Sequence, residues 1–166
     1  MMDNGIIVRQ YEDKDILYMV SIWNEVVEEG ISFPQEECLT ETSGREFFAG
    51  QSYCGVAEEK QTGKIKGLYI LHPNNVGRCG HICNASFAVE SGSRGLHIGE
   101  KLVLDCIRQA HDCGFKILQF NAVVSTNTHA RHLYERTGFK QLGTIPDGFR
   151  LKSGQYADIC PYYIEV

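Results

Sequence analysis

The residues with the clearest potential for chemistry lie in the stretch 90–99, where small residues surround a single arginine, Arg94. This stretch immediately precedes a segment whose apolar residues recur every three to four positions, the spacing of an amphipathic helix. Backbone N–H groups at a helix start lack helical partners and carry the positive end of the helix dipole. Together with a guanidinium that can hold phosphate bidentately, these residues indicate an anion site. The alternative is an ordinary strand–helix loop whose glycines serve only the turn.

Two established phosphate motifs are excluded by the spacing of the glycines. A P-loop requires Gly-x4-Gly-Lys-Ser/Thr, whereas Gly99 is followed by Glu100. A dinucleotide fingerprint requires Gly-x-Gly-x-x-Gly, and Gly95 and Gly99 do not fit that spacing. A phosphate site in this loop must therefore use a different arrangement.

Two other motifs, in order along the chain and separated by one strand, do resemble a known family. They read Val89-x4-Arg94-Gly95-x-x-Ile98-Gly99 and Asn127-x-x-Ala130-x-x-Leu133-Tyr134-Glu135-x-x-Gly138-Phe139. Both are similar to motifs of the GCN5-related N-acetyltransferase (GNAT) family. The resemblance implies an α/β fold and acetyl-CoA as co-substrate, without a metal.

The resemblance also implies a set of coenzyme contacts. In the family this loop wraps the pyrophosphate, which implies binding by Arg94, Gly95, Leu96, His97, Ile98, Gly99 and Glu100. The strand before the loop pairs with pantetheine amides, which implies Phe87, Ala88 and Val89. Asn127 is expected to meet the pantetheine arm and is equally a candidate for a plain helix N-cap.

His97 departs from the family pattern, which has glycine at this position. If the backbone there needs a positive φ or a close approach to phosphate, histidine is a poor substitute for glycine. The alternative is that the His97 side chain itself contacts phosphate.

Acetyl transfer from a thioester to an amine requires a neutral amine, a stabilised carbonyl oxygen and a thiolate that can leave. The resemblance places Tyr134 near the coenzyme sulfur as the acid for the thiolate; the alternative is a core aromatic residue. Glu28 and Glu29 precede the loop where the family forms its acceptor wall, and Glu28 is the candidate base and acceptor ligand. His81, near the start of its strand, is another candidate for the base. A solvated surface carboxylate and a water chain are the alternatives. Phe33, Asn84 and Asn121 complete the predicted acceptor-binding residues.

The pattern of apolar residues and turns predicts a mixed α/β sheet in the order β-α-α-β-β-β-α-β-α-β-β, which agrees with the GNAT plan. A first helix is predicted over residues 14–28, with Asp13 as its N-cap. The central helix is expected to stop at Gly114. A short helix is predicted over 42–49 and a turn or bulge at 146–148. Strands are predicted over 6–9, 53–58, 65–71, 81–89, 117–124, 140–145 and 156–165.

The length of 166 residues predicts a single domain, residues 1–166, around one sizeable core. The formal charge is 16 − 21 = −5 with no basic run, which argues against a nucleic-acid partner. There is no apolar stretch of membrane-spanning length and no signal-peptide pattern at the N-terminus, so we expect a cytoplasmic protein. The seven cysteines are expected to be small buried hydrophobic groups, because Cys79-x3-Cys83 has no second ligand pair at zinc spacing.

Three functions of different classes follow from these observations. The first is an N-acetyltransferase that moves the acetyl group of acetyl-CoA to the amino group of a small molecule by direct attack in a ternary complex. The segment from Trp23 to Phe33 resembles GNAT enzymes that acetylate small amino acids or phosphinothricin. The second is a non-catalytic CoA-binding regulatory module. The third, a nucleotide-binding protein of another fold, is disfavoured by the failed motifs. A homodimer is left open.

Overall fold

The computed structural model describes residues 5–166. Residues 1–4, which belong to the N-terminal stretch without a signal-peptide pattern, lie outside the described residues. The strands of the described chain are β1 (Ile6–Gln10), β2 (Tyr53–Glu59), β3 (Ile65–Pro73), β4 (Ile82–Val89), β5 (Ile117–Val124), β6 (Lys140–Gln141), β7 (Ile145–Arg150) and β8 (Tyr156–Glu165). The α-helices are α1 (Ile16–Glu29), α2 (Glu41–Ala49), α3 (Ile98–Asp112) and α4 (Thr128–Arg136). The predicted order of elements is confirmed as far as α4, after which the structure has three strands, β6, β7 and β8, where two were predicted.

The described strands form one mixed sheet in the order β1-β2-β3-β4-β5-β8-β6, with β7 also paired to β8. Every pairing is antiparallel except that of β4 with β5, which is parallel. A parallel pair needs a crossover connection, and α3 supplies it. The sheet therefore changes direction at β4 and β5, and crevices at such points are where open α/β sheets bind ligands.

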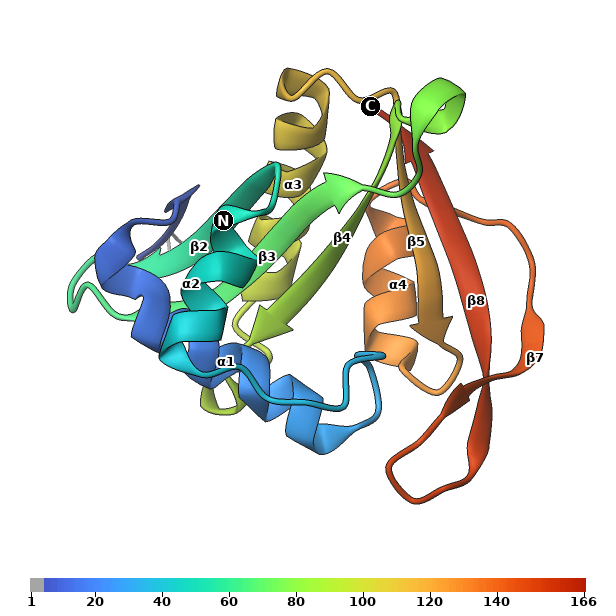
Figure 1. Cartoon of the computed structure of the whole chain (residues 1–166), viewed down its shortest axis with the longest axis horizontal. Helices are drawn as coiled ribbons and strands as arrows, with labels where there is room; N and C mark the ends of the chain where they lie inside the picture. Colours follow the sequence, from blue (N-terminus) through green and yellow to red (C-terminus); the bar gives the residue numbers. More distant parts are fainter. Residues whose placement is uncertain (1–4) are drawn as a thin grey trace.

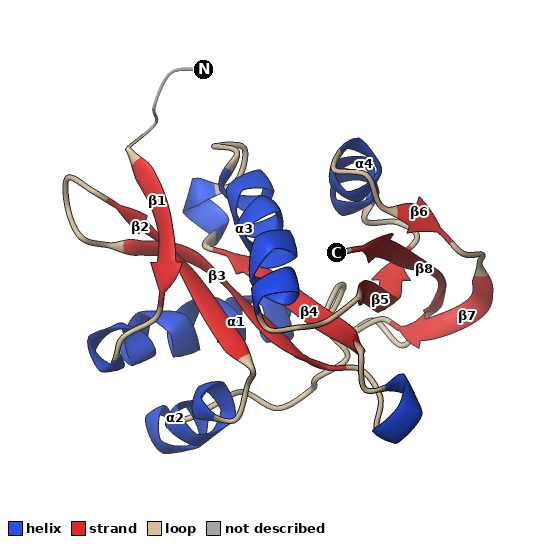
Figure 2. Ribbon diagram, turned by 90° about the horizontal axis from the view of Figure 1, so that it is seen from above, coloured by secondary structure: helices blue, strands red, loops and turns tan. Residues whose placement is uncertain are grey.

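Helices cover both faces of this sheet, with α1 and α2 on one face and α3 and α4 on the other (Figure 2). The first face buries the apolar stripe of α1 around Trp23, whose ring lies 4.4 Å from that of Phe33. The second face buries one side of α3, including Leu102 and Cys106. Burial on both faces explains why β3 and β5 read as largely apolar runs in the sequence. The sheet is thus held rigid around the β4–β5 junction.

Two local details differ from the sequence-based expectations. Asp13 does not cap α1: residues 13–15 form a 3-10 turn, and the Glu12 N–H donates to Asp15 Oδ2 at 2.8 Å. Arg9 also donates to that oxygen at 2.7 Å, which fixes Asp15 in the capping position. The strand predicted over 140–145 is broken after Gln141. Its partner there is Pro161, which accepts from the Leu142 N–H but has no N–H to continue the ladder.

The predicted features at the ends of two other elements are confirmed. Gly114 follows α3 with φ of 85°, as expected for a glycine that stops a helix. The 146–148 segment is a bulge within β7, because the register with β8 shifts between Ile145 and Phe149. Asp147 has φ of 52° in this bulge. Bulges bend a strand and redirect its side chains, so the bulge decides which β7 residues face the α1–α2 loop.

Candidate active site

The β4 and β5 strands separate soon after they begin. Only Ile82 and Cys83 have register partners in β5, namely Ile117 and Leu118. Beyond this point β4 keeps β3 on one edge, and within the described residues no strand pairs with its other edge. Figure 1 shows the two strands diverging toward their arrowheads, with α4 behind the gap. An open strand edge of this kind can pair with an extended ligand that supplies amides.

Aromatic rings close the gap from the side of α4. Phe87 on β4 and Phe120 on β5 meet edge to face, with their ring centroids 5.7 Å apart. The Tyr134 ring lies 4.5 Å from that of Phe120 and 6.4 Å from that of Phe87. Tyr134 therefore lies beside the two strands where they have separated. Phe120 was missed in the sequence because it has the spacing of an ordinary core residue.

The environment of Tyr134 favours the protonated form of its phenol. Its surroundings raise the pKa of the phenol above the ordinary value, because burial disfavours the phenolate. Within residues 5–166 the Tyr134 hydroxyl has no protein hydrogen-bond partner, whereas every buried side-chain oxygen there has a partner. The Tyr134 oxygen is consequently accessible, and the side chain as a whole is partly exposed.

The loop after β4 is fastened at its base by polar contacts. Glu90 accepts hydrogen bonds from Lys66 Nζ at 2.8 Å and from Ser93 Oγ at 2.6 Å. These two contacts, the one with Lys66 first, hold the pKa of the Glu90 carboxyl below its usual value. The Ser91 N–H donates to Glu25 Oε2 at 3.0 Å, which ties the loop to α1. The loop thus has a defined shape before any ligand binds.

Two residues of the loop have left-handed backbone conformations. Gly95 has φ of 84°, and a Cβ atom there would meet nothing within 4 Å. His97 has φ of 58° and is the N-cap of α3, although histidine is disfavoured in this conformation. The position where the family has glycine therefore keeps a glycine-like backbone here. The exposed His97 side chain has its Nδ1 atom 3.3 Å from Glu100 Oε2.

Arg94 has a partner that sequence reasoning did not foresee. Its guanidinium forms an ion pair with Glu29 at the end of α1, and about half of the arginine side chain is exposed. The Arg94 side chain can therefore bind phosphate only by sharing or exchanging this carboxylate. Separation by 65 positions in the sequence hides this pair from any local pattern.

The helix on the other side of the gap, α4, begins at an asparagine N-cap. Asn127 Oδ1 accepts from the Ala130 N–H at 3.2 Å, so the expected N-cap is confirmed. Its side-chain nitrogen is not used by this contact and can serve a second partner. The start of α3 packs close to α4, because a Cβ atom on Gly99 would lie 3.5 Å from Leu133 Cδ2. The start of α3, which follows the loop, and α4 therefore lie close together.

A polar network that the sequence did not reveal fastens α4 to the sheet. The Arg131 Nε–H donates to the Tyr162 hydroxyl oxygen at 3.2 Å. That hydroxyl in turn donates to Glu135 Oε1 at 3.0 Å and lies 3.2 Å from Gln141 Oε1. Tyr162 is buried, and its ring lies 6.0 Å from that of Tyr134. This network holds in place the helix that carries Tyr134.

The predicted acceptor residues fall into two groups. Glu28 and Phe33 line a cleft of about 590 Å³ between the end of α1, the following loop and the β7–β8 hairpin. Glu28 is exposed, and its Oε1 atom lies 3.8 Å from Cys38 Sγ. Phe33 is buried against Trp23 and forms an apolar wall. A volume in this range suits a small-molecule ligand.

Asn84 and Asn121 do not line this cleft. Asn84 Oδ1 accepts from the N–H of Ala85 at 2.8 Å, next to the point where β4 loses its β5 partner. Asn121 is exposed and exchanges two hydrogen bonds with Asn74, at 2.6 and 3.2 Å. Gln119 also donates to Asn121 Oδ1 at 2.9 Å. The structure therefore brings Glu28 and Phe33 together and gives Asn121 other partners.

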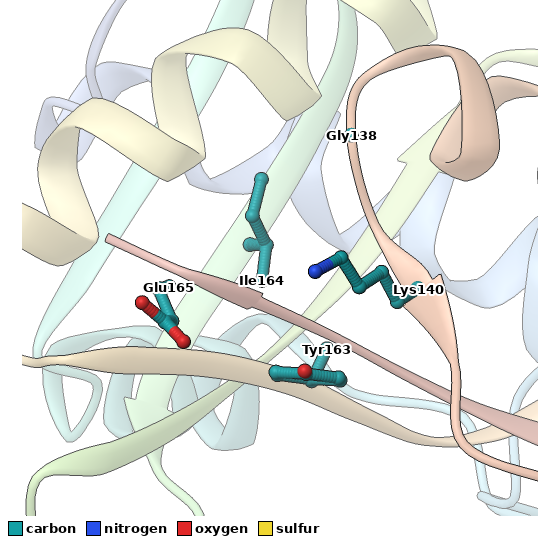
Figure 3. A pocket seen from close by; sticks show the side chains of 5 residues that line it. All are labelled: Gly138, Lys140, Tyr163, Ile164 and Glu165. Carbon is teal, nitrogen blue, oxygen red and sulfur yellow. The ribbon is translucent and has the colours of Figure 1, made fainter.

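A second hollow, of about 240 Å³, lies at the far end of β8 (Figure 3). It is lined by Lys140 on β6 and by Tyr163, Ile164 and Glu165 on β8. None of these residues belongs to the predicted site. We assign this hollow no role in acetyl transfer.

No group of three or more histidine, cysteine, aspartate or glutamate residues in the described part of the chain could hold a metal ion. The cysteine expectation is only partly right: Cys54, Cys83, Cys106 and Cys160 are buried, whereas Cys38, Cys79 and Cys113 are exposed. The three exposed cysteines lie in a loop, a 3-10 turn and a helix end, where their side chains do not pack into the core. Among residues 5–166, no helix has the length and apolar character needed to cross a membrane.

Comparison with known proteins agrees with this geometry. The acetyltransferase (GNAT) family model matches residues 19–139, which is most of the chain. The chain belongs to the GNAT family. The fold class and the assignment as an acetyltransferase are thereby confirmed, and the central loop, the open strand edge and α4 all lie within the matched residues.

Individual relatives show the same likeness. N-acetyltransferase aca1 of Schizosaccharomyces pombe is 32% identical over 157 residues, covering 84% of this chain and 74% of that protein. A GCN5-related N-acetyltransferase from Kribbella flavida is 31% identical and superimposes with a TM-score of 0.89, covering 98% of both chains. A phosphinothricin acetyltransferase from Sinorhizobium meliloti, solved with acetyl-CoA, shares the fold at 17% identity and a TM-score of 0.89, covering 98% of this chain and 89% of that one.

Proposed function

We propose that residues 1–166 act as one catalytic domain that transfers the acetyl group of acetyl-CoA to the amino group of a small molecule. The observation that carries this proposal is the β4 edge left open beyond Cys83, with the helix-start loop at one end and Tyr134 beside it. In this arrangement the pyrophosphate lies on the N–H groups of residues 94–100. The pantetheine amides pair with residues 87–89, and Asn127 contacts the same arm.

The transfer proceeds by direct attack in a ternary complex. The acceptor ammonium first loses a proton to Glu28 or to water held by it, because only the neutral amine is nucleophilic. The nitrogen then attacks the thioester carbonyl carbon, and a C–N bond forms as the C–S bond breaks. The departing thiolate takes the proton of the Tyr134 phenol, and the second proton lost by the nitrogen restores the phenol through solvent. The products are an N-acetylated amine and CoA.

The position of Glu28 supports its part in this scheme. Glu28 lines a cleft of small-molecule size, and Phe33 lines the same cleft. Lys152 Nζ donates to the Glu28 backbone oxygen at 2.7 Å, which fixes the end of α1 that carries the carboxylate. A carboxylate at the mouth of the cleft attracts an ammonium group and accepts its proton.

The proposal is tested by release of the CoA thiol in the presence of a panel of amines, with the acetylated product identified by mass spectrometry. Binding of acetyl-CoA, CoA, ATP and NAD is measured separately by thermal shift. We expect stabilisation by the two CoA compounds alone, and turnover with at least one small amine. Binding of acetyl-CoA without turnover on any amine would indicate the non-catalytic module instead. Absence of acetyl-CoA binding would overturn the proposed function.

A further inference from the structure

The cleft beside Glu28 is lined by charged groups of both signs, which come from two separate segments of the chain. Glu28 and Glu36 belong to the end of α1 and the loop that follows it, whereas Arg150 and Lys152 belong to the β7–β8 hairpin. Phe33 and Phe149 are buried and form the apolar surface between them. A ligand that fills this cleft therefore meets carboxylates, cationic groups and apolar surface.

The two cationic residues of the hairpin do different things. Lys152 Nζ donates to the Glu28 backbone oxygen, and the Lys152 N–H donates to the Gly30 backbone oxygen at 3.0 Å. The Lys152 charge thus satisfies the C-terminal end of α1 and fastens the hairpin to it. Arg150, by contrast, has one ion-pair partner among residues 5–166, the carboxylate of Glu36. Its guanidinium is the cation of the cleft that can change partners.

The ion pair of Arg150 with Glu36 is easily exchanged. The Arg150 side chain is 57% exposed and that of Glu36 is 75% exposed. Pairs of this kind contribute little to stability, since water and salt screen them. The carboxylate of a bound molecule can therefore replace the Glu36 carboxylate beside Arg150. A guanidinium favours bidentate binding of such a carboxylate.

The bulge in β7 directs Arg150 to the cleft. A Cβ atom on Gly148 would lie 2.5 Å from Ile159 Cγ1, so the bulged backbone packs directly onto β8. After the bulge, Phe149 pairs with Ala157 and turns inward, and Arg150 pairs with Tyr156 and stays exposed. Bulges that re-aim a side chain are common beside active sites.

We propose that Arg150 determines acceptor specificity by binding a carboxylate of the acceptor, while Glu28 receives the amino group. The acceptor class is accordingly a small amphoteric amine, such as an amino acid, and Glu36 occupies the carboxylate position until the acceptor arrives. This inference rests on the proposed function. A cationic group and a carboxylate that line one cleft orient an amphoteric amine there, whereas an amine without a carboxylate leaves Arg150 paired with Glu36.

The first experiment compares amino acids with their carboxamides, which keep the amino group and lose the negative charge. We expect Arg150→Gln to lower kcat/KM for the carboxylate-bearing acceptor about 10- to 100-fold, the range of a charge-assisted hydrogen-bonded contact. The value for the carboxamide should change by less than about twofold. Comparing each variant with wild type on the same acceptor cancels the difference in basicity between the two amines. A parallel loss on both acceptors, or an unchanged ratio, overturns the proposal.

Two further variants separate recognition from structure. Glu36→Gln removes the internal competitor, so KM for the carboxylate-bearing acceptor should fall severalfold while KM for the carboxamide stays the same. A merely structural ion pair predicts that Glu36→Gln and Arg150→Gln act in the same direction. Arg45→Gln is the matched control, because Arg45 is also an exposed arginine paired with carboxylates, Asp13 and Glu41, but does not line the cleft. It should leave both acceptors unaffected.

Failure of the proposed function is distinguishable from failure of this inference. If wild type acetylates no amine, the proposed function fails, and calorimetric binding of the amino acid and its carboxamide to the CoA-loaded protein replaces turnover. Preference for the carboxylate that disappears in Arg150→Gln supports the inference. Equal binding of the two compounds, or a preference that survives the substitution, overturns it.

Discussion

Tyr134 combines a packed ring with an accessible hydroxyl, and this combination allows a clean substitution. Tyr134→Phe keeps the contacts with Phe87 and Phe120 and removes only the proton donor. We expect kcat to fall by about 10²–10⁴-fold, the usual contribution of general acid catalysis. The KM for acetyl-CoA and the melting temperature should hardly change. Tyr18→Phe, at an exposed position on α1, serves as the control. Full turnover by Tyr134→Phe would return this residue to a packing role.

The raised pKa of Tyr134 has a consequence for the pH profile. Because burial raises the pKa of the phenol, its protonated form persists above pH 10, near which an ordinary tyrosine ionises. Activity should therefore rise with pH as the amine loses its proton, and kcat should not decline near pH 10 through loss of this donor. A kcat profile extended past pH 10 checks the expectation. A decline near pH 10 that vanishes in Tyr134→Phe would contradict it.

Arg94 links the coenzyme loop to α1 through Glu29, so two substitutions should act in opposite directions. Arg94→Ala should weaken acetyl-CoA binding about tenfold or more, because a charge-assisted contact contributes roughly 1.5–3 kcal/mol. Glu29→Gln frees the guanidinium and should leave binding unchanged or tighter. Titration calorimetry with acetyl-CoA measures both. Unchanged affinity in Arg94→Ala would remove the guanidinium from the phosphate site and leave it as the partner of Glu29 alone.

At the scale of the element, the start of α3 carries a histidine in a conformation that suits glycine. Non-glycine residues in the left-handed region cost roughly 1–2 kcal/mol, and glycine avoids that cost at some expense in chain entropy. His97→Gly should therefore raise the free energy of unfolding by up to about 1 kcal/mol and leave acetyl-CoA affinity intact. Denaturant unfolding and calorimetry provide the two measurements. A large loss of affinity would mean that the imidazole itself contacts the coenzyme.

The whole molecule buries four of its seven cysteines, which gives a test of the packing on both faces of the sheet. Burial raises the pKa of Cys54 and Cys83 to about 12, so their reactive thiolate forms are scarce near pH 8. A thiol reagent should label Cys38 and Cys79 rapidly in the native protein, Cys113 more slowly because partial burial raises the pKa of its thiol, and all seven cysteines after denaturation. Peptide mapping identifies the labelled sites. Rapid native labelling of Cys54 or Cys83 would contradict the packing described.

Local signals in the sequence were sufficient for most elements and for the two coenzyme motifs. Helix periodicity, the Gly114 stop and the Asn127 cap depend on contacts within a few residues, so they are legible in a single chain. The identity of His97 marked one of the two non-glycine residues that have a positive φ in the described chain, the other being Asp147. Local signals also misled, because Asp13 is a good cap by type, whereas Arg9 and Glu12 select Asp15.

The tertiary structure alone decided how the site is assembled. The divergence of β4 and β5 depends on which strands pair, and strand pairing joins residues far apart in the chain. The same is true of Phe120 beside Tyr134, of Arg94 with Glu29, and of Arg150 with Glu36, whose partners are 114 positions apart. Such contacts leave no periodicity or spacing in the sequence, because they arise only when the sheet, the helices and the hairpin pack together.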